Sequence, residues 1–274
     1  MTRPDLIIMK MGGSVVTVKD SPLTANLTAI DGISKIVLEL RKKYKVIIVH
    51  GGGSFGHYWS VKYDMHTKPL PYSDEGISIV HESMIQLNHI IIKKFIENRL
   101  KPYTIQPSTF VYRGLPDSDK IESILDITTK NDIVPVTFGD VIHTTENNFS
   151  ILSGDTIMSL LATKLHPKYC MFLTNVDGLF GDINKRDLLH EVQLDNLVSL
   201  VTKTNTRSSD GDTDNSPFDV TGGMKRKVSE SIPIVKSGTP VYFLNGFEPQ
   251  RMLDIIEGKD YVGTCFKLKP ISQI

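Results

Sequence analysis

Continuous apolar runs of strand length alternate with amphipathic stretches along the first part of the chain. Residues 6–11 (LIIMKM) and 45–50 (KVIIVH) are mainly apolar runs, and a glycine-rich turn follows each. The first run breaks at Gly12 and Gly13 and then resumes, so we expect the strand to continue after the turn. Between them, residues 30–40 repeat apolar side chains at the three- and four-residue spacing of a helix. The pattern predicts a strand–helix–strand unit with a glycine turn at the end of each strand.

The same alternation continues along the chain. Residues 76–100 are a long amphipathic stretch typical of a helix, and short apolar runs follow at residues 102–107, 134–142 and 170–180. Strands that alternate with helices favour parallel pairing, with helices covering both faces of the sheet. We therefore expect an α/β fold, a three-layer αβα sandwich with a mainly parallel central sheet.

The domain organisation follows from two local changes in composition. The sequence KLHPK at residues 164–168 precedes a new strand, and we place a boundary there. It divides one continuous fold into an N-terminal lobe of residues 1–165 and a C-terminal lobe of residues 166–274. Residues 202–218 contain almost no large apolar side chain, so we expect a surface loop there.

Composition and charge exclude several classes of partner. Thirty-one basic residues balance 31 acidic ones, so no overall field attracts nucleic acid or an anionic membrane. The apolar runs are much shorter than the roughly 20 residues of a membrane-spanning helix, and no signal-peptide pattern opens the sequence. Cys170 and Cys265 lack the spacing of a zinc site and favour a reducing compartment, although a single disulfide stays open. We expect a cytoplasmic protein without a protein-built metal site.

The turn in residues 46–57 (VIIVHGGGSFGH) matches two familiar patterns by its letters. It contains the G-x-G-x-x-G of dinucleotide-binding proteins and the G-x-S-x-G of serine hydrolases, with Ser54 as the nucleophile. No strand ending in an acidic residue follows about 20 residues later, as a dinucleotide fold needs. A hydrolase needs a separate oxyanion loop, whereas here the same residues would serve both purposes. Neither pattern is supported by its surroundings.

The physical property shared by these glycines is their ability to bind phosphate. Consecutive glycines between a strand and a helix let backbone N–H groups point at an anion, and the helix N-terminus adds positive potential. Four small-residue turns of this kind occur, at residues 10–14, 50–57, 152–156 and 221–225. The chain has neither a G-x-x-x-x-G-K-[ST] loop nor an H-R-D-x-x-x-x-N loop, so it is neither a P-loop kinase nor a protein kinase.

Taken together, the motifs MKMGGSVVTVKD, VHGGGSFGH, ILSGDT, TNVDGLF and DVTGGMKRK resemble the amino acid kinase superfamily. They occur in the family's order across nearly the whole chain. Within the superfamily, GGGSFGH with its terminal His57 is similar to the isopentenyl phosphate kinases and to fosfomycin kinase. The resemblance implies ATP-dependent phosphorylation of isopentenyl phosphate to isopentenyl diphosphate, with Mg²⁺ held mainly by phosphate and water, and a homodimer built on the N-terminal lobe.

The resemblance also implies roles for individual residues. Lys10 contacts the ATP phosphates, Lys19 stabilises the transition state, and Asp155 orients the lysines. The acceptor phosphate is bound by His57 with Gly52 and Gly154. The residues implied to bind ATP are Lys10, Met11, Gly12, Gly13, Ser14, Gly53, Asp177, Gly222 and Lys225.

Two departures and two alternatives remain at this stage. Asn175 and Thr156 stand where the family more often has Asp, which leaves the nucleotide contacts open. The alternatives are a fosfomycin kinase-like enzyme, or another kinase of small phosphates or phosphonates, and a non-catalytic nucleotide- or oxyanion-binding protein. For the apolar tail of the acceptor we consider one face of the helix at residues 77–92, although such a face is more often core. Its candidates are Ile79, Val80, Met84 and Leu87.

Overall fold

The structure is a computed structural model that describes residues 5–65, 71–145, 148–182, 187–198 and 222–268. The surface loop expected at residues 202–218 lies outside the described residues. No helix within the described ranges has the length and apolar character needed to span a membrane.

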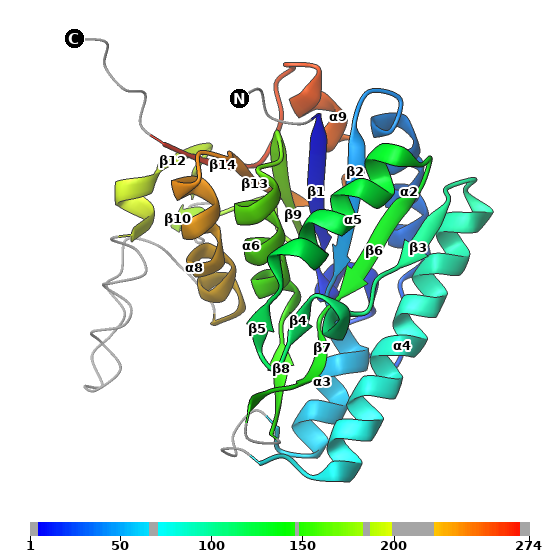
Figure 1. The fold of residues 1–274 in the computed structure, drawn as a ribbon. Coiled ribbons are helices and arrows are strands. Elements are labelled where there is room, and N and C mark those ends of the chain that lie inside the picture. Colours follow the sequence, from blue (N-terminus) through cyan, green and yellow to red (C-terminus); the bar gives the residue numbers. More distant parts are fainter. Residues whose placement is uncertain (1–4, 66–70, 146–147, 183–186, 199–221, 269–274) are drawn as a thin grey trace.

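A single eight-stranded sheet forms the centre of the described part of the chain (Figure 1). Its strand order is β12-β14-β13-β9-β1-β2-β6-β3, and every neighbouring pair is parallel except β13 with β14. The strands are β1 (Leu6–Met11), β2 (Lys45–His50), β3 (Pro102–Thr104), β6 (Val134–Phe138), β9 (Tyr169–Thr174), β12 (Glu191–Gln193), β13 (Val241–Asn245) and β14 (Thr264–Lys267). Both lobes expected from the sequence contribute strands to this sheet.

Three two-stranded antiparallel pairs lie outside the main sheet. They are β4 (Val111–Tyr112) with β5 (Leu115–Pro116), β7 (Asp140–His143) with β8 (Phe149–Leu152), and β10 (Phe180–Asp182) with β11 (Asp187–Leu188).

Helices cover both faces of the sheet, which confirms the three-layer sandwich (Figure 1). One face is covered by α5 (Ser118–Lys130), α6 (Gly154–Leu165) and α8 (Gly222–Lys236), the other by α2 (Leu27–Leu40), α4 (Asp74–Glu97) and α9 (Arg251–Ile256). The described residues also form two shorter helices, α1 (Gly13–Val16) and α3 (Gly53–Lys62), and the 3₁₀ turn η1 (Pro107–Thr109). Residues 194–198 are helical as well.

The central strands β1, β2 and β9 are mainly apolar because both of their faces are buried. Along β1, Leu6 and Ile8 pack in the core under α5, α6 and α8, whereas Ile7 and Met9 pack in the core under α2, α4 and α9. Successive side chains of a strand point to opposite faces, so each strand contributes to both cores. The parallel strands β1, β2 and β9 end at the same edge of the sheet, and the glycine turns that follow β1 and β2 meet there.

Two sequence-based expectations about elements were wrong. The apolar residues after Gly12, read as a resumed strand, form the one-turn helix α1. The run at residues 134–142 splits at Gly139, where β6 stays in the main sheet and β7 leaves it to pair with β8. A Cβ at Gly139 would lie 2.9 Å from the backbone nitrogen of Gly154. The turn between β6 and β7 therefore lies directly against the start of α6, with no room for a side chain.

Candidate active site

A cleft of about 1180 Å³ opens at the edge of the sheet where β1, β2 and β9 end. It contains ten of the residues expected from the sequence, namely Lys10, Gly13, Ser14, Lys19, Gly52, Gly53, His57, Gly154, Asp155 and Asp177. Three others, Met11, Gly12 and Lys225, are not among the described lining residues, and the surroundings of the fourth, Gly222, lie outside the described part of the structure. Met11 follows Lys10 in a strand and therefore points to the opposite face, into the core.

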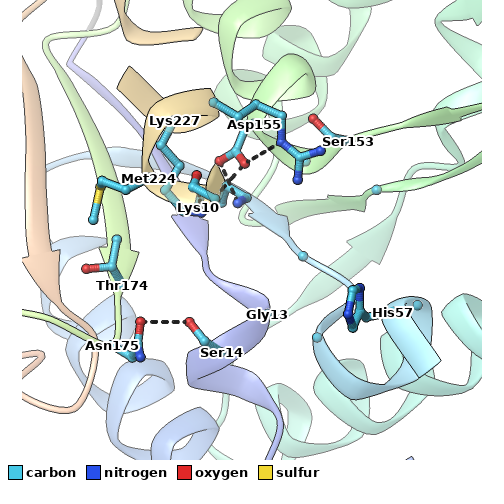
Figure 2. Close-up of a pocket in the computed structure, with 18 of the residues that line it drawn as sticks. Lys10, Gly13, Ser14, His57, Ser153, Asp155, Thr174, Asn175, Met224 and Lys227 are labelled. Carbon is cyan, nitrogen blue, oxygen red and sulfur yellow. Dashed lines mark hydrogen bonds and ion pairs between the residues drawn. The ribbon is translucent and has the colours of Figure 1, made fainter. Parts of the chain in front are cut away.

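Three cations converge on one buried carboxylate in the cleft (Figure 2). Asp155 Oδ1 lies 2.7 Å from Lys10 Nζ, and its Oδ2 lies 3.6 Å from Arg226 Nε and 3.8 Å from Lys227 Nζ. Burial opposes ionisation of Asp155, but Lys10 and then Lys227 hold its pKa below the ordinary value. Burial, reinforced by Lys10, lowers the pKa of Lys227 to about 8. One negative charge among three positive ones leaves an electropositive pocket suited to a polyanion.

Local structure fixes both members of the central ion pair. Lys10 is the penultimate residue of β1 and is 4% exposed, so its position is set by the sheet. Asp155 lies in the first turn of α6, where the Ser153 hydroxyl caps the helix by accepting a hydrogen bond from Thr156 N at 3.1 Å. A carboxylate in the first turn is favoured by the helix dipole. Its position beside the glycine turns thus follows from the start of the helix.

Helix α8 places two basic side chains in the cleft that the sequence analysis did not single out. The sequence motif pointed to Lys225, but Arg226 and Lys227 line the cleft together with Gly223. Residues three and four apart lie on one face of a helix, which groups Gly223, Arg226 and Lys227 and leaves Lys225 off that face. With the start of the helix placed at Gly222, this spacing would have favoured Lys227 over Lys225 as the lysine that shares the face of Gly223.

The second glycine turn leads into α3 on the other side of the cleft. Gly52 is the N-cap of α3, and Gly53 adopts a positive φ of 47°. His57 lies on this helix, is exposed and faces the cleft across from the cation cluster (Figure 2). The cleft therefore has a strongly cationic side and a side that offers an imidazole and a helix N-terminus, which is an arrangement for two anionic groups.

An apolar wall adjoins the His57 side. Val80 and Met84, four residues apart on α4, line the cleft together with Ile151 and Leu152 of β8. Leu87 is instead fully buried in the core under the sheet, and Ile79 is not a lining residue. Only half of the helical face considered for an apolar tail therefore reaches the cleft.

The two departures from the family's pattern have partners. Asn175 Oδ1 accepts a hydrogen bond from the Ser14 hydroxyl at 3.2 Å, joining the turn after β9 to the turn after β1 (Figure 2). The Thr156 hydroxyl donates to Glu230 Oε1 at 2.7 Å, which links α6 to α8. Asp177 accepts hydrogen bonds from Arg251 and Asn245, and the Arg251 guanidinium holds its pKa below the ordinary value.

Ser54 has no environment that would activate a nucleophile. Its hydroxyl is buried and has no hydrogen-bond partner among the described residues, and its backbone nitrogen donates to the Thr17 hydroxyl at 2.9 Å. A nucleophilic serine needs a base in contact with its hydroxyl. The G-x-S-x-G pattern is therefore coincidental.

His50 makes stability depend on pH at this edge of the sheet. It is fully buried, its Nδ1 lies 3.1 Å from Gly51 O and its Nε2 3.3 Å from Asn88 Oδ1, and burial lowers its pKa to about 4. The unfolded chain binds that proton near pH 6.5, so stability present above pH 6.5 is lost as the pH falls toward 4, by about 3 kcal/mol. Urea unfolding at about pH 7 and pH 4.5 should show a smaller acid-induced loss in His50→Gln than in the wild type. Equal losses would contradict this.

Comparisons with known proteins show a likeness along nearly the whole chain. The model of the amino acid kinase family matches residues 5–245. Isopentenyl phosphate kinase from Thermoplasma acidophilum is 34% identical over 266 residues, covering 96% of this chain and 100% of that protein. Isopentenyl phosphate kinase from Methanocaldococcus jannaschii is 30% identical over 239 residues, covering 81% of this chain and 85% of that protein.

Solved structures show the same likeness. The chain matches an isopentenyl phosphate kinase substrate complex with a TM-score of 0.75 and 30% identity, over 96% of this chain and 99% of that chain. It matches a product complex of the T. acidophilum isopentenyl phosphate kinase with a TM-score of 0.75 and 31% identity, over 96% of this chain and 100% of that chain.

Proposed function

This chain belongs to the amino acid kinase family, and on that premise we propose that it transfers the γ-phosphoryl group of ATP to isopentenyl phosphate, forming isopentenyl diphosphate and ADP. The observation that carries the proposal is the cleft itself. A cluster of Lys10, Arg226 and Lys227 faces a glycine turn that ends in His57, with an apolar wall beside it. These features suit a triphosphate, a second phosphate and a short hydrocarbon tail.

The chemistry requires charge stabilisation more than proton transfer. An oxygen of the acceptor phosphate attacks the γ-phosphorus, a new O–P bond forms, and the bond to the β-phosphate oxygen breaks as ADP leaves. The acceptor is largely ionised near neutral pH, since its second pKa is about 6, so no general base is needed. The obstacle is repulsion between two polyanions, which fixed cations and N–H donors offset.

We assign roles to the lining residues accordingly. Lys10 and Lys227 neutralise the ATP phosphates, with Gly13, Ser14 and Gly53 as backbone or hydroxyl donors, and Asp155 holds the cations in place. Exposed Lys19 at the mouth of the cleft stabilises charge that develops on the transferring group. His57, Gly52 and Gly154 bind the acceptor phosphate. The lobe of residues 1–165 thus supplies the acceptor side, and the lobe of residues 166–274 supplies much of the nucleotide side.

Mg²⁺ is the metal ion we propose to accompany ATP. The described residues contain no group of three or more His, Cys, Asp or Glu arranged to hold a metal. The three carboxylates described in the cleft all have basic partners: Asp155 pairs with Lys10, Asp177 with Arg251, and Asp140 with His81. Phosphate oxygens and water therefore supply most of the ligands, as is common for Mg²⁺, and the ion neutralises charge on the β and γ phosphates when bound.

An acceptor panel separates this proposal from its rivals. ADP release should be measured with isopentenyl phosphate, dimethylallyl phosphate, fosfomycin, acetylglutamate and UMP. The proposal predicts the highest kcat/KM with an isopentenyl-type phosphate. Preference for fosfomycin would instead assign a phosphonate kinase, and binding of ATP without turnover of any acceptor would assign a non-catalytic protein.

The acceptor role of His57 has its own test. His57→Ala should lower kcat/KM for isopentenyl phosphate about 30-fold, because a hydrogen bond to a charged group contributes about 2 kcal/mol. His89→Ala removes an exposed histidine of α4 that does not line the cleft and should leave kcat/KM unchanged. Equal kinetics for the two variants would remove His57 from the site.

Assembly and location are further parts of the proposal. β3 is an edge strand with Tyr103 54% exposed, and the β4–β5 hairpin exposes the cross-strand pair Tyr112 and Leu115 at 70% and 67%. An edge with no further strand beside it among the described residues, together with exposed apolar side chains, supports a homodimer through the N-terminal lobe. Light scattering should then give twice the 30.6 kDa of one chain.

Use of ATP and the free thiols of Cys170 and Cys265 support a cytoplasmic location.

A further inference from the structure

The two glycine turns of the cleft are in direct backbone contact. A Cβ at Gly13 would lie 2.6 Å from Gly53 Cα, and a Cβ at Gly51 would lie 2.8 Å from Gly13 N, both closer than real Cβ atoms approach. One turn follows β1 and the other follows β2, so two phosphate-binding segments meet with no side chain between them.

One side chain joins these turns, and it is Thr17. Its hydroxyl donates a hydrogen bond to Gly13 O at 2.8 Å and accepts one from Ser54 N at 2.9 Å. Thr17 is 3% exposed, and its backbone is held separately, by Thr17 N donating to Gly13 O at 3.0 Å and by a bridge to Ala25. A single hydroxyl therefore uses its donor on one turn and its acceptor capacity on the other.

We propose that Thr17 is a positioning residue that sets the distance and orientation between the ATP phosphates and the acceptor phosphate. The inference deepens the proposed function and rests on it. Gly13 and Ser14 lie on the nucleotide side of the contact, whereas the second turn leads through Gly52 into the helix that carries His57, on the acceptor side (Figure 2). Thr17 itself does not line the cleft, so it acts through the two backbones.

The physical reason is the sensitivity of group transfer to geometry. The attacking oxygen and the γ-phosphorus must approach to about 3–3.5 Å in line, and a misplacement of about 1 Å costs on the order of 100-fold in rate. The bond between Ser54 N and Thr17 fixes the first turn of α3 relative to the turn after β1. Without it, Gly13 and Ser14 still bind the nucleotide and Gly52 and His57 still bind the acceptor, but the distance between the two phosphates is no longer fixed.

The substitution Thr17→Val tests this directly because it keeps the volume and the branched shape while removing the hydroxyl. We expect kcat to fall about 30-fold while the KM values for ATP and isopentenyl phosphate change less than about threefold, because binding to each turn survives. The fraction of ADP formed with water as acceptor should rise. Thr17→Ser, which restores the hydroxyl, should bring kcat to within about threefold of the wild type.

Thr128→Val is the matched control. Thr128 is also fully buried, and its hydroxyl donates to Ile133 O at 3.0 Å, but it lies on α5 and does not line the cleft. This variant should be destabilised without a change in kcat or in the product ratio. A loss of kcat in Thr17→Val no greater than in Thr128→Val would overturn the proposal.

Hydrogen exchange provides a readout that does not depend on the acceptor. The Ser54 amide should exchange faster in Thr17→Val than in the wild type and be unaffected in Thr128→Val. If the wild-type chain uses another acceptor of the panel, the proposed function fails, and the same kcat comparison with that acceptor still tests the positioning role. Unchanged protection of the Ser54 amide would contradict the role whatever the acceptor is.

Discussion

Gly53→Ala is expected to lower kcat at least about 100-fold and to lower the free energy of unfolding by about 3 kcal/mol. Gly53 has φ 47°, where an L-residue costs about 1–2 kcal/mol. Its new Cβ would also overlap the Thr17 hydroxyl and Gly13 O, and Thr17 Cγ2 would lie 2.7 Å away. Because backbone cannot yield as a flexible side chain does, the two glycine turns must separate.

Gly258→Ala separates the clash from the backbone strain. Gly258 also has a positive φ, 68°, but a Cβ there meets nothing within 4 Å. Only the conformational cost remains, so this variant should lose about 1 kcal/mol of stability and keep the wild-type kcat. Both variants should be compared by urea unfolding and by steady-state kinetics. If kcat of Gly53→Ala stayed within threefold of Gly258→Ala, close contact of the two turns would be irrelevant to transfer.

Lys10→Met is expected to lower kcat/KM about 1000-fold, which corresponds to about 4 kcal/mol of transition-state stabilisation. The substitution removes the cation that lies 2.7 Å from the Asp155 carboxylate. Asp155 is only 1% exposed, so its charge is then left with the longer contacts to Arg226 and Lys227. Breaking a buried ion pair from one side also destabilises the fold, by about 3 kcal/mol. Activity and unfolding should both be measured.

Two further variants distinguish catalysis from folding. Lys168→Met removes a half-exposed lysine paired with Asp5 at 3.2 Å and should leave both stability and kcat close to the wild type, because solvent screens such a pair. The double variant Lys10→Met with Asp155→Asn removes both buried charges and should recover part of the stability but none of the activity. Recovery of activity in the double variant would mean that Lys10 matters only for folding.

Much of the fold was predictable because its elements have clear periodicity. Residues 6–11 and 45–50 form β1 and β2 as expected, and the helix expected at residues 76–100 is α4, which begins and ends a few residues earlier. The burial of β1 and β2 on both faces is visible in the sequence as mainly apolar runs. The short α1 was missed because apolar side chains on a single turn of helix look the same as those of a strand continuing past Gly12.

The cleft was predictable from glycine turns but its full set of cations was not. Lys10 and Asp155 stand next to recognisable turns, and the structure brings them together. Arg226 and Lys227 reach the cleft through the rotation of α8, which depends on where that helix starts, and element boundaries are poorly specified by local sequence. Partners such as Glu230 for Thr156, 74 residues away, follow from helix packing that no local pattern encodes.

The most direct measurement of the central claim is ³¹P NMR of the wild-type chain with ATP, Mg²⁺ and isopentenyl phosphate. The proposed function predicts loss of the phosphate monoester signal and growth of two mutually coupled signals of a new organic diphosphate, in equal amount to the ADP formed. Formation of ADP with inorganic phosphate alone, or an unchanged monoester signal while ATP is present in excess, would contradict it.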